Sequence, residues 1–388
     1  MGILLLNIVS FAMPGDAYIN PLAWGSGRPV DLAAWGVNQL LFEGRMRGLL
    51  ALLFGAGVLL GAARAERRLR WHYARMAVLA LFGLGHGYLL WNGDILLHYA
   101  ILGCLLPVAW DWSAGRLVRA AIVVLTLQTL LLSLQFGAAF VFRAAAEAPG
   151  ASESLVAGYR AMIASFPQPG SATVAADLAA YRGEWPDILD YHWNVRGDAP
   201  LRLLQFAGGE TLGYMLLGMG LARSGMLTGQ VSGRALGRMM AWGYGIGLPA
   251  LAGLTAWAAA TRFDPIVLMG NFLAWSIPFR VATALAHLAL VLWLARRFAA
   301  STIVQRIASV GRMAFTNYLA TSLVMTTLFY GYGGALFGRI GRAELYFFVA
   351  AMWAAMLIAS PWWLARYGTG PLERLWRALS GRIANATQ

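Results

Sequence analysis

Ionisable side chains inside apolar segments are the residues of this chain whose types and spacing could do chemistry. The stretch "HGYLLWNGDILLHY", residues 86–99, holds His86, Asp94 and His98. Histidine is a base whose ordinary pKa lies near neutrality, and a neighbouring carboxylate can orient its ring. Asp94 and His98 are four residues apart and therefore share one face of a helix. Asp94 also follows Gly93 in a predicted turn, so it is either an N-cap or the group that orients a histidine.

A second set of polar groups is spread over further apolar segments. They are Glu43, Arg45, Arg47, Glu210, Arg280, His287 and Asn317. Ionisable groups in a membrane span usually face the protein interior and are candidates for function. The spacing of Glu43 and Arg47 favours either a structural ion pair or a substrate contact. We expect Arg280 to bind an anion or a carboxylate, with His287 on the same helix face as a second candidate base.

The apolar composition determines the class of fold that positions these residues. Hydrophobic residues make up 59% of the 388 residues and charged residues 12%, whereas about a quarter of a soluble domain is charged. Segments near the roughly 20 apolar residues that cross a bilayer predict membrane helices. Their approximate ranges are 2–13, 38–61, 72–91, 94–110, 117–142, 201–222, 236–260, 268–295, 313–331 and 344–364. We therefore predict an all-α, polytopic integral membrane helix bundle with about ten transmembrane helices.

The positions of the arginines predict the orientation of this bundle. All thirty basic residues are Arg, which excludes Schiff-base chemistry on a lysine. Eighteen of them lie in alternate loops and the C-terminal tail, whereas the intervening short loops hold four. The positive-inside rule then places both termini in the cytoplasm, with the chain in a bacterial cytoplasmic (inner) membrane. The net charge of +13 thus indicates topology, and we expect membrane lipids and no nucleic acid as partners.

A long segment between the fifth and sixth predicted helices divides the chain. Residues 1–142 are predicted to hold helices one to five, 143–200 an extracytoplasmic helical cap, and 201–388 helices six to ten with a cytoplasmic tail. The first segment, "MGILLLNIVSFAM", is short for a span and lacks the basic region and cleavage site of a signal peptide. We expect the first helix to begin upstream of Met1.

Two common site motifs are absent from the sequence. The pattern GxxxxGK[ST] of a phosphate-binding loop does not occur, so ATP is not supported as a ligand, and neither does HExxH. Cys104 is the single cysteine and is expected to pack in a helix. We therefore predict no metal site and no tightly bound cofactor.

Several stretches together resemble the YeiB-like family, domain of unknown function 418. They are "GILLLNI", "FEGRMRGLLALLFGAG", "GDILLHYAILG", "LLGMGLARSG", "GRMAFTNYLATSL" and "PWWLARYGTGPLERLWRALS". They keep the order of the family and cover nearly the whole chain. The family pattern begins upstream with further residues of the first helix, including an Arg-Gly pair that this chain lacks.

The resemblance implies a reaction class. The family is similar to a wider group of membrane acyltransferases, which include sugar O-acyltransferases and the heparan glucosaminide N-acetyltransferase type. These enzymes move an acyl group from cytoplasmic acyl-CoA to an acceptor on the far side. For this chain the resemblance implies acetyl-CoA or another acyl-CoA as donor and a small-molecule or glycan acceptor outside. The glucosaminide enzymes carry a histidine in an early loop, but the matching "PGDAYINPLAWGSGRPVDLAAW" has none, so the base must be another residue.

The first hypothesis is therefore a transmembrane acyltransferase. His98 or His86 is the expected base, oriented by Asp94, and Asn317 or Arg280 is expected to polarise the acyl carbonyl. The Arg-rich inner rim, including Arg312, is expected to hold CoA. Because these histidines lie near the outer side, either the thioester threads the bundle or His287 is the base.

Two other classes of function stay open. A proton-coupled transporter of a small anionic or lipid-like solute also needs buried carboxylates, arginines and histidines. Pro249 and Pro278 are expected to break the seventh and eighth helices, as in transporters with discontinuous helices. A structural or sensory membrane protein without turnover is the third class. The sequence does not predict the oligomeric state.

Overall fold

The computed structural model describes residues 1–388 apart from 26, 63–67, 228 and 387–388. Arg64 and Arg67, counted above in an Arg-rich loop, thus lie outside the described residues. The described part of the chain is helical with intervening loops and contains no strand. The predicted all-α class is therefore confirmed.

Each of the ten predicted segments contains a helix, and shorter helices lie between them. In chain order the elements are α1 (Leu4–Ala12), α2 (Asp16–Ile19), α3 (Pro29–Leu41), α4 (Arg45–Ala62), α5 (Arg68–Leu89), α6 (Leu96–Gly103), the 3₁₀ turn η1 (Leu106–Ala109), α7 (Ala114–Ala146), α8 (Glu153–Ala164), α9 (Ala172–Tyr181), α10 (Trp185–Asn194), α11 (Ala199–Arg223), α12 (Gly233–Ala260), α13 (Pro265–Gly270), the π-helical turn η2 (Asn271–Trp275), α14 (Ile277–Arg297), α15 (Thr302–Arg312), α16 (Ala314–Phe329), α17 (Leu345–Tyr367) and α18 (Pro371–Ala386).

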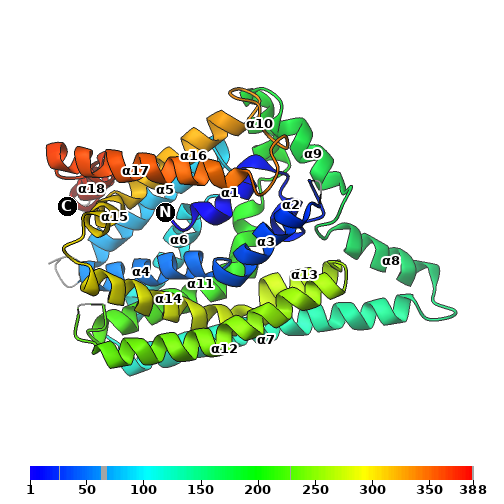
Figure 1. The fold of residues 1–388 in the computed structure, drawn as a ribbon, viewed down its shortest axis with the longest axis horizontal. Helices are drawn as coiled ribbons and strands as arrows, with labels where there is room; N and C mark the ends of the chain where they lie inside the picture. The colour runs from blue at the N-terminus through cyan, green and yellow to red at the C-terminus, as the bar shows by residue number, and fades with distance from the viewer. Residues whose placement is uncertain (26, 63–67, 228, 387–388) are drawn as a thin grey trace.

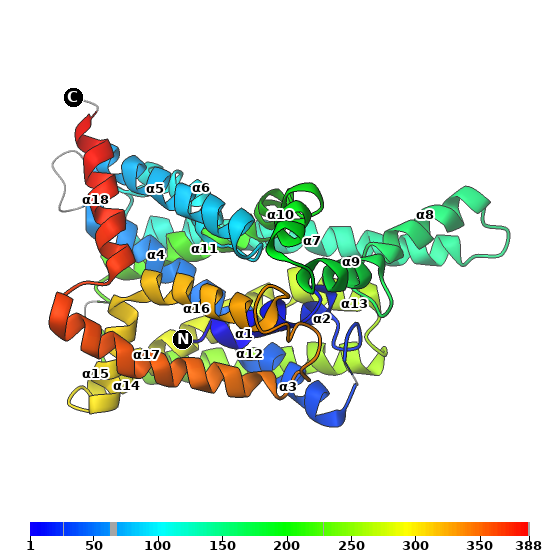
Figure 2. The same cartoon turned by 90° about the horizontal axis from the view of Figure 1, so that it is seen from above.

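The long helices run roughly along one axis of the molecule (Figure 1). α11 packs between α4 and α7, and α12 packs on α14. On the other side α5 packs on α6, and α1 packs on α16 and α17, as Figure 2 shows from above. The contacts thus form two groups of helices, one around α11 and α14 and the other around α5, α6 and α16.

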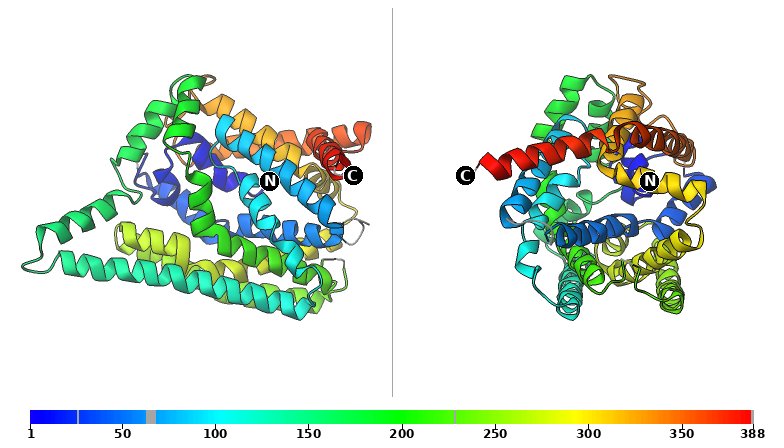
Figure 3. Two further views of the ribbon diagram at one scale, coloured as in Figure 1. Left: turned by 180° about the vertical axis from the view of Figure 1, so that it is seen from behind. Right: turned by 90° about the vertical axis from the view of Figure 1, so that its left-hand side faces the viewer.

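The two ends of the bundle differ in composition. The end at the left of Figure 1 carries α15, α18, the start of α5 and the end of α11, and we call it the Arg-rich end. The opposite side carries α8, α9 and α10, which we call the cap helices. The right-hand view of Figure 3 shows α18 lying across the Arg-rich end. The Arg-rich segments thus gather at one end, as the predicted alternation of loops requires.

Four helical segments of the described residues are long and apolar enough to cross a membrane. They are Pro29–Gly61, Ala114–Ala146, Ile277–Arg297 and Leu345–Tyr367. The remaining predicted spans are shorter or more polar. The chain is accordingly a membrane protein, whereas the number of ten spans and the cytoplasmic position of both termini stay predictions.

The structure corrects the boundaries of three predicted spans. The segment 38–61 is broken at 42–44, between α3 and α4, and Gly44 has a φ of +73° there. The segment 94–110 ends as a helix at Gly103, before the 3₁₀ turn that contains Pro107. The segment 268–295 contains the π-helical turn, and Pro278 lies in the first turn of α14. Pro249, by contrast, lies inside the continuous helix α12, so its expected break is wrong.

The segment 143–200 contains α8, α9 and α10, and α7 extends into it as far as Ala146. α8 packs along α7, and the two helices project beyond the rest of the bundle (Figure 3). α10 packs on α5 and α9. Asp177 of α9 accepts hydrogen bonds from Gly15 N, Tyr191 Oη and Arg196 Nη2 at 2.7, 2.6 and 2.8 Å. The cap is therefore joined to the loop that follows α1.

Direct backbone contact holds α4 against α11. A Cβ atom added at Gly218 would lie 1.8 Å from the Leu52 carbonyl oxygen, and one added at Gly55 would lie 2.0 Å from the Met215 carbonyl oxygen. Small residues permit this close approach of membrane helices. The glycine-rich stretches of α4 and α11 thus pack these two helices together.

Replacing Gly218 with alanine should therefore destabilise the protein. Gly218→Ala forces α4 and α11 apart and is expected to cost roughly 1–3 kcal/mol of unfolding free energy, as overpacking does elsewhere. Gly208→Ala on the same helix is the matched control, because nothing lies within 4 Å of its added Cβ. Thermal unfolding in detergent compares the two variants. Equal melting temperatures would contradict the close packing.

Candidate functional site

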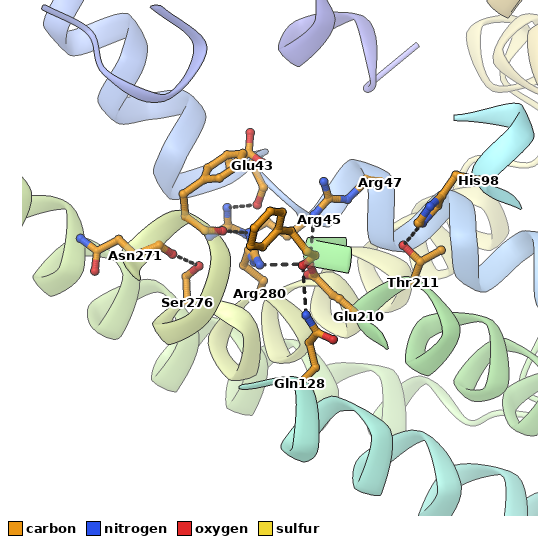
Figure 4. Close-up of polar contacts among 12 residues, drawn as sticks. Glu43, Arg45, Arg47, His98, Gln128, Glu210, Thr211, Asn271, Ser276 and Arg280 are labelled. Carbon is orange, nitrogen blue, oxygen red and sulfur yellow. Dashed lines mark hydrogen bonds and ion pairs between the residues drawn. The ribbon is translucent and has the colours of Figure 1, made fainter. Parts of the chain in front are cut away.

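Five buried or partly buried residues form the first polar group, the charged cluster. It consists of Glu43, Arg45, Arg47, Glu210 and Arg280, contributed by the α3–α4 break, α4, α11 and α14 (Figure 4). Glu210 Oε2 lies 3.0 Å from Arg47 Nη2 and 3.1 Å from Arg280 Nη2. One carboxylate therefore neutralises arginines from two different helices.

The predicted ion pair of Glu43 with Arg47 is wrong. Arg47 pairs with Glu210, and Glu43 Oε2 accepts a hydrogen bond from Tyr18 Oη at 2.7 Å. The reason is the break at 42–44, which leaves Glu43 outside α4. Two residues that lie four apart share a helix face only when one continuous helix contains both.

Arg45 is the arginine of the charged cluster without a carboxylate ion-pair partner among the described residues. Its side chain is fully buried, and Nε donates to Thr283 Oγ1 at 2.9 Å. Nη1 donates to the backbone oxygens of Gln39 and Glu43 at 2.7 and 2.8 Å. Within the described residues Arg45 Nη2, Arg280 Nε and Glu210 Oε1 have no hydrogen-bond partner. Three arginines thus face two carboxylates, and donors remain unsatisfied.

The space beside the charged cluster is small. A cavity of about 30 Å³ is lined by Gln39, Glu43, Asn271, Ser276 and Arg280, among others. That volume holds about a water molecule or two. Arg280 has its carboxylate partner in Glu210 and also donates to the Phe272 carbonyl oxygen at 2.8 Å. The expected anion at Arg280 is therefore a carboxylate of this chain.

The stretch 86–99 forms the second polar group. His86 Nδ1 lies 2.8 Å from Asp94 Oδ1, and Asp94 Oδ2 accepts the Leu97 N–H at 2.8 Å. Asp94 is thus both a cap of α6 and the group that orients a histidine. It orients His86 and not His98, because α6 begins only at Leu96. His98 Nε2 instead lies 3.0 Å from Thr211 Oγ1.

His86 and Asp94, which we call the His86 dyad, are buried but retain an unused nitrogen. His86 is 4% exposed, and its Nε2 has no hydrogen-bond partner in the described part of the chain. The imidazole contacts the rings of Trp91 and Tyr318, with centroids 5.9 and 5.1 Å away. The hydroxyl of Tyr318 is also without a partner among the described residues. The His86 dyad and Tyr318 thus hold two buried polar atoms without partners among the described residues.

Two cavities flank the His86 dyad on either side of α16. The first, about 540 Å³, is the central cavity, which is lined by Tyr99, Asn317 and Tyr318 and by many apolar residues of α1, α4, α6 and α15. It extends from Ile95, next to Asp94, to Ile307 and Trp376 near the Arg-rich end. The second is an apolar groove of about 600 Å³ between α5, α16 and α18, which His86 itself lines.

The other predicted site residues lie apart from the dyad. His287 Nδ1 lies 2.7 Å from the Thr283 carbonyl oxygen, and its ring contacts Tyr244. Neither His287 nor His98 lines the central cavity. Asn317 lines the central cavity, and its Nδ2 donates to Val310 O and Ser360 Oγ, both at 3.1 Å.

Sequence reasoning missed several partners of these residues. Tyr18, Thr211 and Thr283 are neutral hydroxyl residues whose spacing shows no relation to the ionisable groups. Tyr318 had one signal, because it directly follows Asn317 in "GRMAFTNYLATSL". Its contact with His86 could not be foreseen from the sequence.

The fold and the site define an α-helical membrane protein with buried ionisable groups and an internal cavity. Residues 221–382 match the family model "Protein of unknown function (DUF418)". The chain is 35% identical over 394 residues to "Uncharacterized protein YeiB" of Escherichia coli K12, which covers 99% of this chain and 94% of that protein. It is 29% identical over 391 residues to "Uncharacterized protein YxaH" of Bacillus subtilis 168, covering 97% and 90%.

The chain therefore belongs to the YeiB-like DUF418 family. The match extends along almost the whole chain and not only the C-terminal half, which agrees with the order of the stretches quoted above. No solved structure matches the chain.

Proposed function

We propose that this protein is a transmembrane acyltransferase of the bacterial cytoplasmic membrane, with both termini in the cytoplasm. It moves an acyl group from acyl-CoA at the Arg-rich end to an acceptor near the His86 dyad. The observation that carries the proposal is the contact between the His86 ring and Tyr318, a residue that lines the central cavity. Asp94 orients His86, Tyr318 contacts His86 and lines the cavity, and the cavity extends to the Arg-rich end.

The chemistry follows from the unused groups. With Nδ1–H donating to Asp94, His86 Nε2 is free to take the proton of an acceptor hydroxyl or amine. The acceptor atom then attacks the thioester carbonyl carbon, and the C–S bond breaks. The CoA thiolate leaves and receives the proton from His86. The hydroxyl of Tyr318, whose ring contacts His86, would stabilise the developing oxyanion.

The central cavity would hold the acyl arm of the donor. Its length from Ile307 to Ile95 and its mostly apolar lining suit an acyl-pantetheine chain. Asn317, in the first turn of α16, would contact polar groups of that chain. Arg312 at the Arg-rich end donates to Ser309 Oγ at 3.2 Å and is placed to contact CoA phosphates.

Incubation of the purified full-length protein with labelled acetyl-CoA tests this proposal. We expect free CoA thiol to be released. The labelled acetyl group should be recovered as acetate, when water is the acceptor, or on an added amine. His98→Ala and His287→Ala should retain this activity, because these histidines pair with Thr211 and with the Thr283 carbonyl oxygen and not with Asp94. Absence of both thiol release and CoA binding at millimolar acetyl-CoA would contradict the proposal.

A proton-coupled transporter of an anionic solute is the second candidate. The observation that favours it is the meeting of two irregular helices at the charged cluster, namely the break at 42–44 and the π-helical turn Asn271–Trp275. Discontinuous helices often form binding sites in transporters. Uptake into proteoliposomes that depends on a pH gradient and is lost in Arg280→Gln would support transport instead of acyl transfer.

A further inference from the structure

A third cavity at the Arg-rich end is lined mainly by aromatic rings. It measures about 130 Å³ and is bounded by Phe54 of α4, Trp71 of α5, Trp110 after η1 and Trp376 of α18. We call these four residues the tryptophan cage. His72, Arg75 and Met76 of α5 and Gly57 and Val58 of α4 also line the cavity. The charged cluster and the His86 dyad contribute no residue to it.

The rings of the tryptophan cage are held in place by specific contacts. The Arg75 guanidinium lies between two of them, 4.4 Å from the Trp71 centroid and 4.0 Å from the Trp376 centroid. Trp376 Nε1 donates to the Arg75 carbonyl oxygen at 3.2 Å. His72 meets Trp110 edge to face at 5.3 Å. A preformed aromatic pocket of this kind is a ligand site that needs little rearrangement.

One donor in the tryptophan cage is unused. Trp110 is 4% exposed, and its Nε1 has no hydrogen-bond partner among the residues that the structure describes. A buried N–H group without a partner is unfavourable. The Trp110 N–H is therefore an unsatisfied donor in the wall of the tryptophan cage.

The charges around the tryptophan cage restrict the class of ligand. Arg75 occupies the space between two rings, and the Arg68 guanidinium lies 5.7 Å from the Trp110 centroid. A cationic ligand such as a quaternary ammonium would be repelled by both. A ligand with a neutral planar ring, acceptor nitrogens in that ring and attached phosphates fits all three features of the cage. Its ring stacks on the indoles, a ring nitrogen accepts the Trp110 N–H, and its phosphates pair with the arginines.

We propose that the tryptophan cage binds the base of an adenine nucleotide, with its phosphates toward Arg68 and Arg75. Adenine offers ring nitrogens as acceptors and stacks on aromatic side chains. A cavity of about 150 Å³ accommodates benzene in an engineered protein. The cavity of about 130 Å³ is therefore of a size for part of the base, with the rest of the nucleotide outside the cavity. Phe54 and Trp376 line both this cavity and the central cavity.

Which adenine nucleotide binds follows from the proposed function, and this part of the inference rests on that function. The adenine nucleotide is then the ADP-containing end of the acyl-CoA donor. With the base in the cage, the pantetheine arm would pass Phe54 and Trp376 into the central cavity. The arrangement thus assigns separate cavities to the two ends of one donor.

Binding of ADP to the purified full-length protein tests the inference directly. Titration calorimetry in detergent should show ADP binding that Trp110→Phe weakens about 5- to 10-fold, as expected for loss of one hydrogen bond. Trp242→Phe, at a 69% exposed tryptophan of α12, is the matched control and should bind ADP normally. Melting temperatures of the variants establish that Trp110→Phe is folded.

A second readout separates this inference from the proposed function. Trp110→Phe should raise the KM for acetyl-CoA but leave turnover of acetyl-pantetheine, which lacks the nucleotide, unchanged. Absence of ADP binding at millimolar concentration, or binding that is equal in Trp110→Phe, overturns the cage site even if acetyl transfer occurs. ADP binding that depends on Trp110 without any acetyl transfer supports the cage site and overturns the proposed function.

Discussion

Glu210→Gln is expected to be the most destabilising single substitution in the charged cluster. Glu210 carries the ion pairs of both Arg47 and Arg280, and Arg280 is 2% exposed. Removing one partner of a buried ion pair leaves an uncompensated buried charge, which typically costs about 3–5 kcal/mol. Unfolding by titration with a denaturing detergent, followed by circular dichroism, measures the effect.

Two companion variants make this result specific. Glu153→Gln, an exposed residue of α8, removes a carboxylate without a buried partner and should leave stability close to wild type. Adding Arg280→Gln to Glu210→Gln removes part of the uncompensated charge and should recover part of the lost stability. If Glu210→Gln unfolds like Glu153→Gln, the charged cluster does not depend on this ion-pair network.

His86→Ala is expected to have the largest effect on activity. Loss of a general base typically lowers a rate by about 10²- to 10⁴-fold, and His86 is the histidine in contact with Tyr318 at the central cavity. The rate of CoA thiol release from acetyl-CoA measures the loss. A rate of His86→Ala equal to that of wild type would show that the base is another residue.

Asp94→Asn separates the two roles of Asp94. Asparagine is as good an N-cap as aspartate, so the hydrogen bond from Leu97 N can persist and stability should change little. The carboxylate that orients His86 is lost, so thiol release should fall nearly as far as in His86→Ala. A variant that keeps both its stability and its rate would assign Asp94 to capping alone.

The helical class and the presence of the polar residues could be predicted from the sequence, because both depend on local composition. Apolar segments predict helices, and charged residues within them are rare enough to be noticed. The irregular backbone at 42–44 and at the π-helical turn was harder to predict from the sequence. These breaks depend on packing between distant segments. A Cβ atom added at Gly44, for example, would lie 2.3 Å from Cδ of Arg280, whose side chain fills the space beside the break.

The pairing of the site residues could not be predicted, because the partners are distant in sequence. Glu210 is 163 residues from Arg47 and 70 from Arg280. Asp94 has two histidines nearby in sequence, and only the course of the chain before α6 determines that it orients His86. The central cavity depends on the packing of α1, α15 and α16, which no local pattern specifies.

A transfer assay with sidedness tests the central claim most directly. The protein is placed in sealed proteoliposomes, sorted by accessibility of the C-terminal segment, and labelled acetyl-CoA is supplied on one side only. The account predicts thiol release only when acetyl-CoA is on the side of the Arg-rich end, with the label recovered on the opposite side. Thiol release on neither side, or label that stays with the donor, would contradict acyl transfer across the membrane.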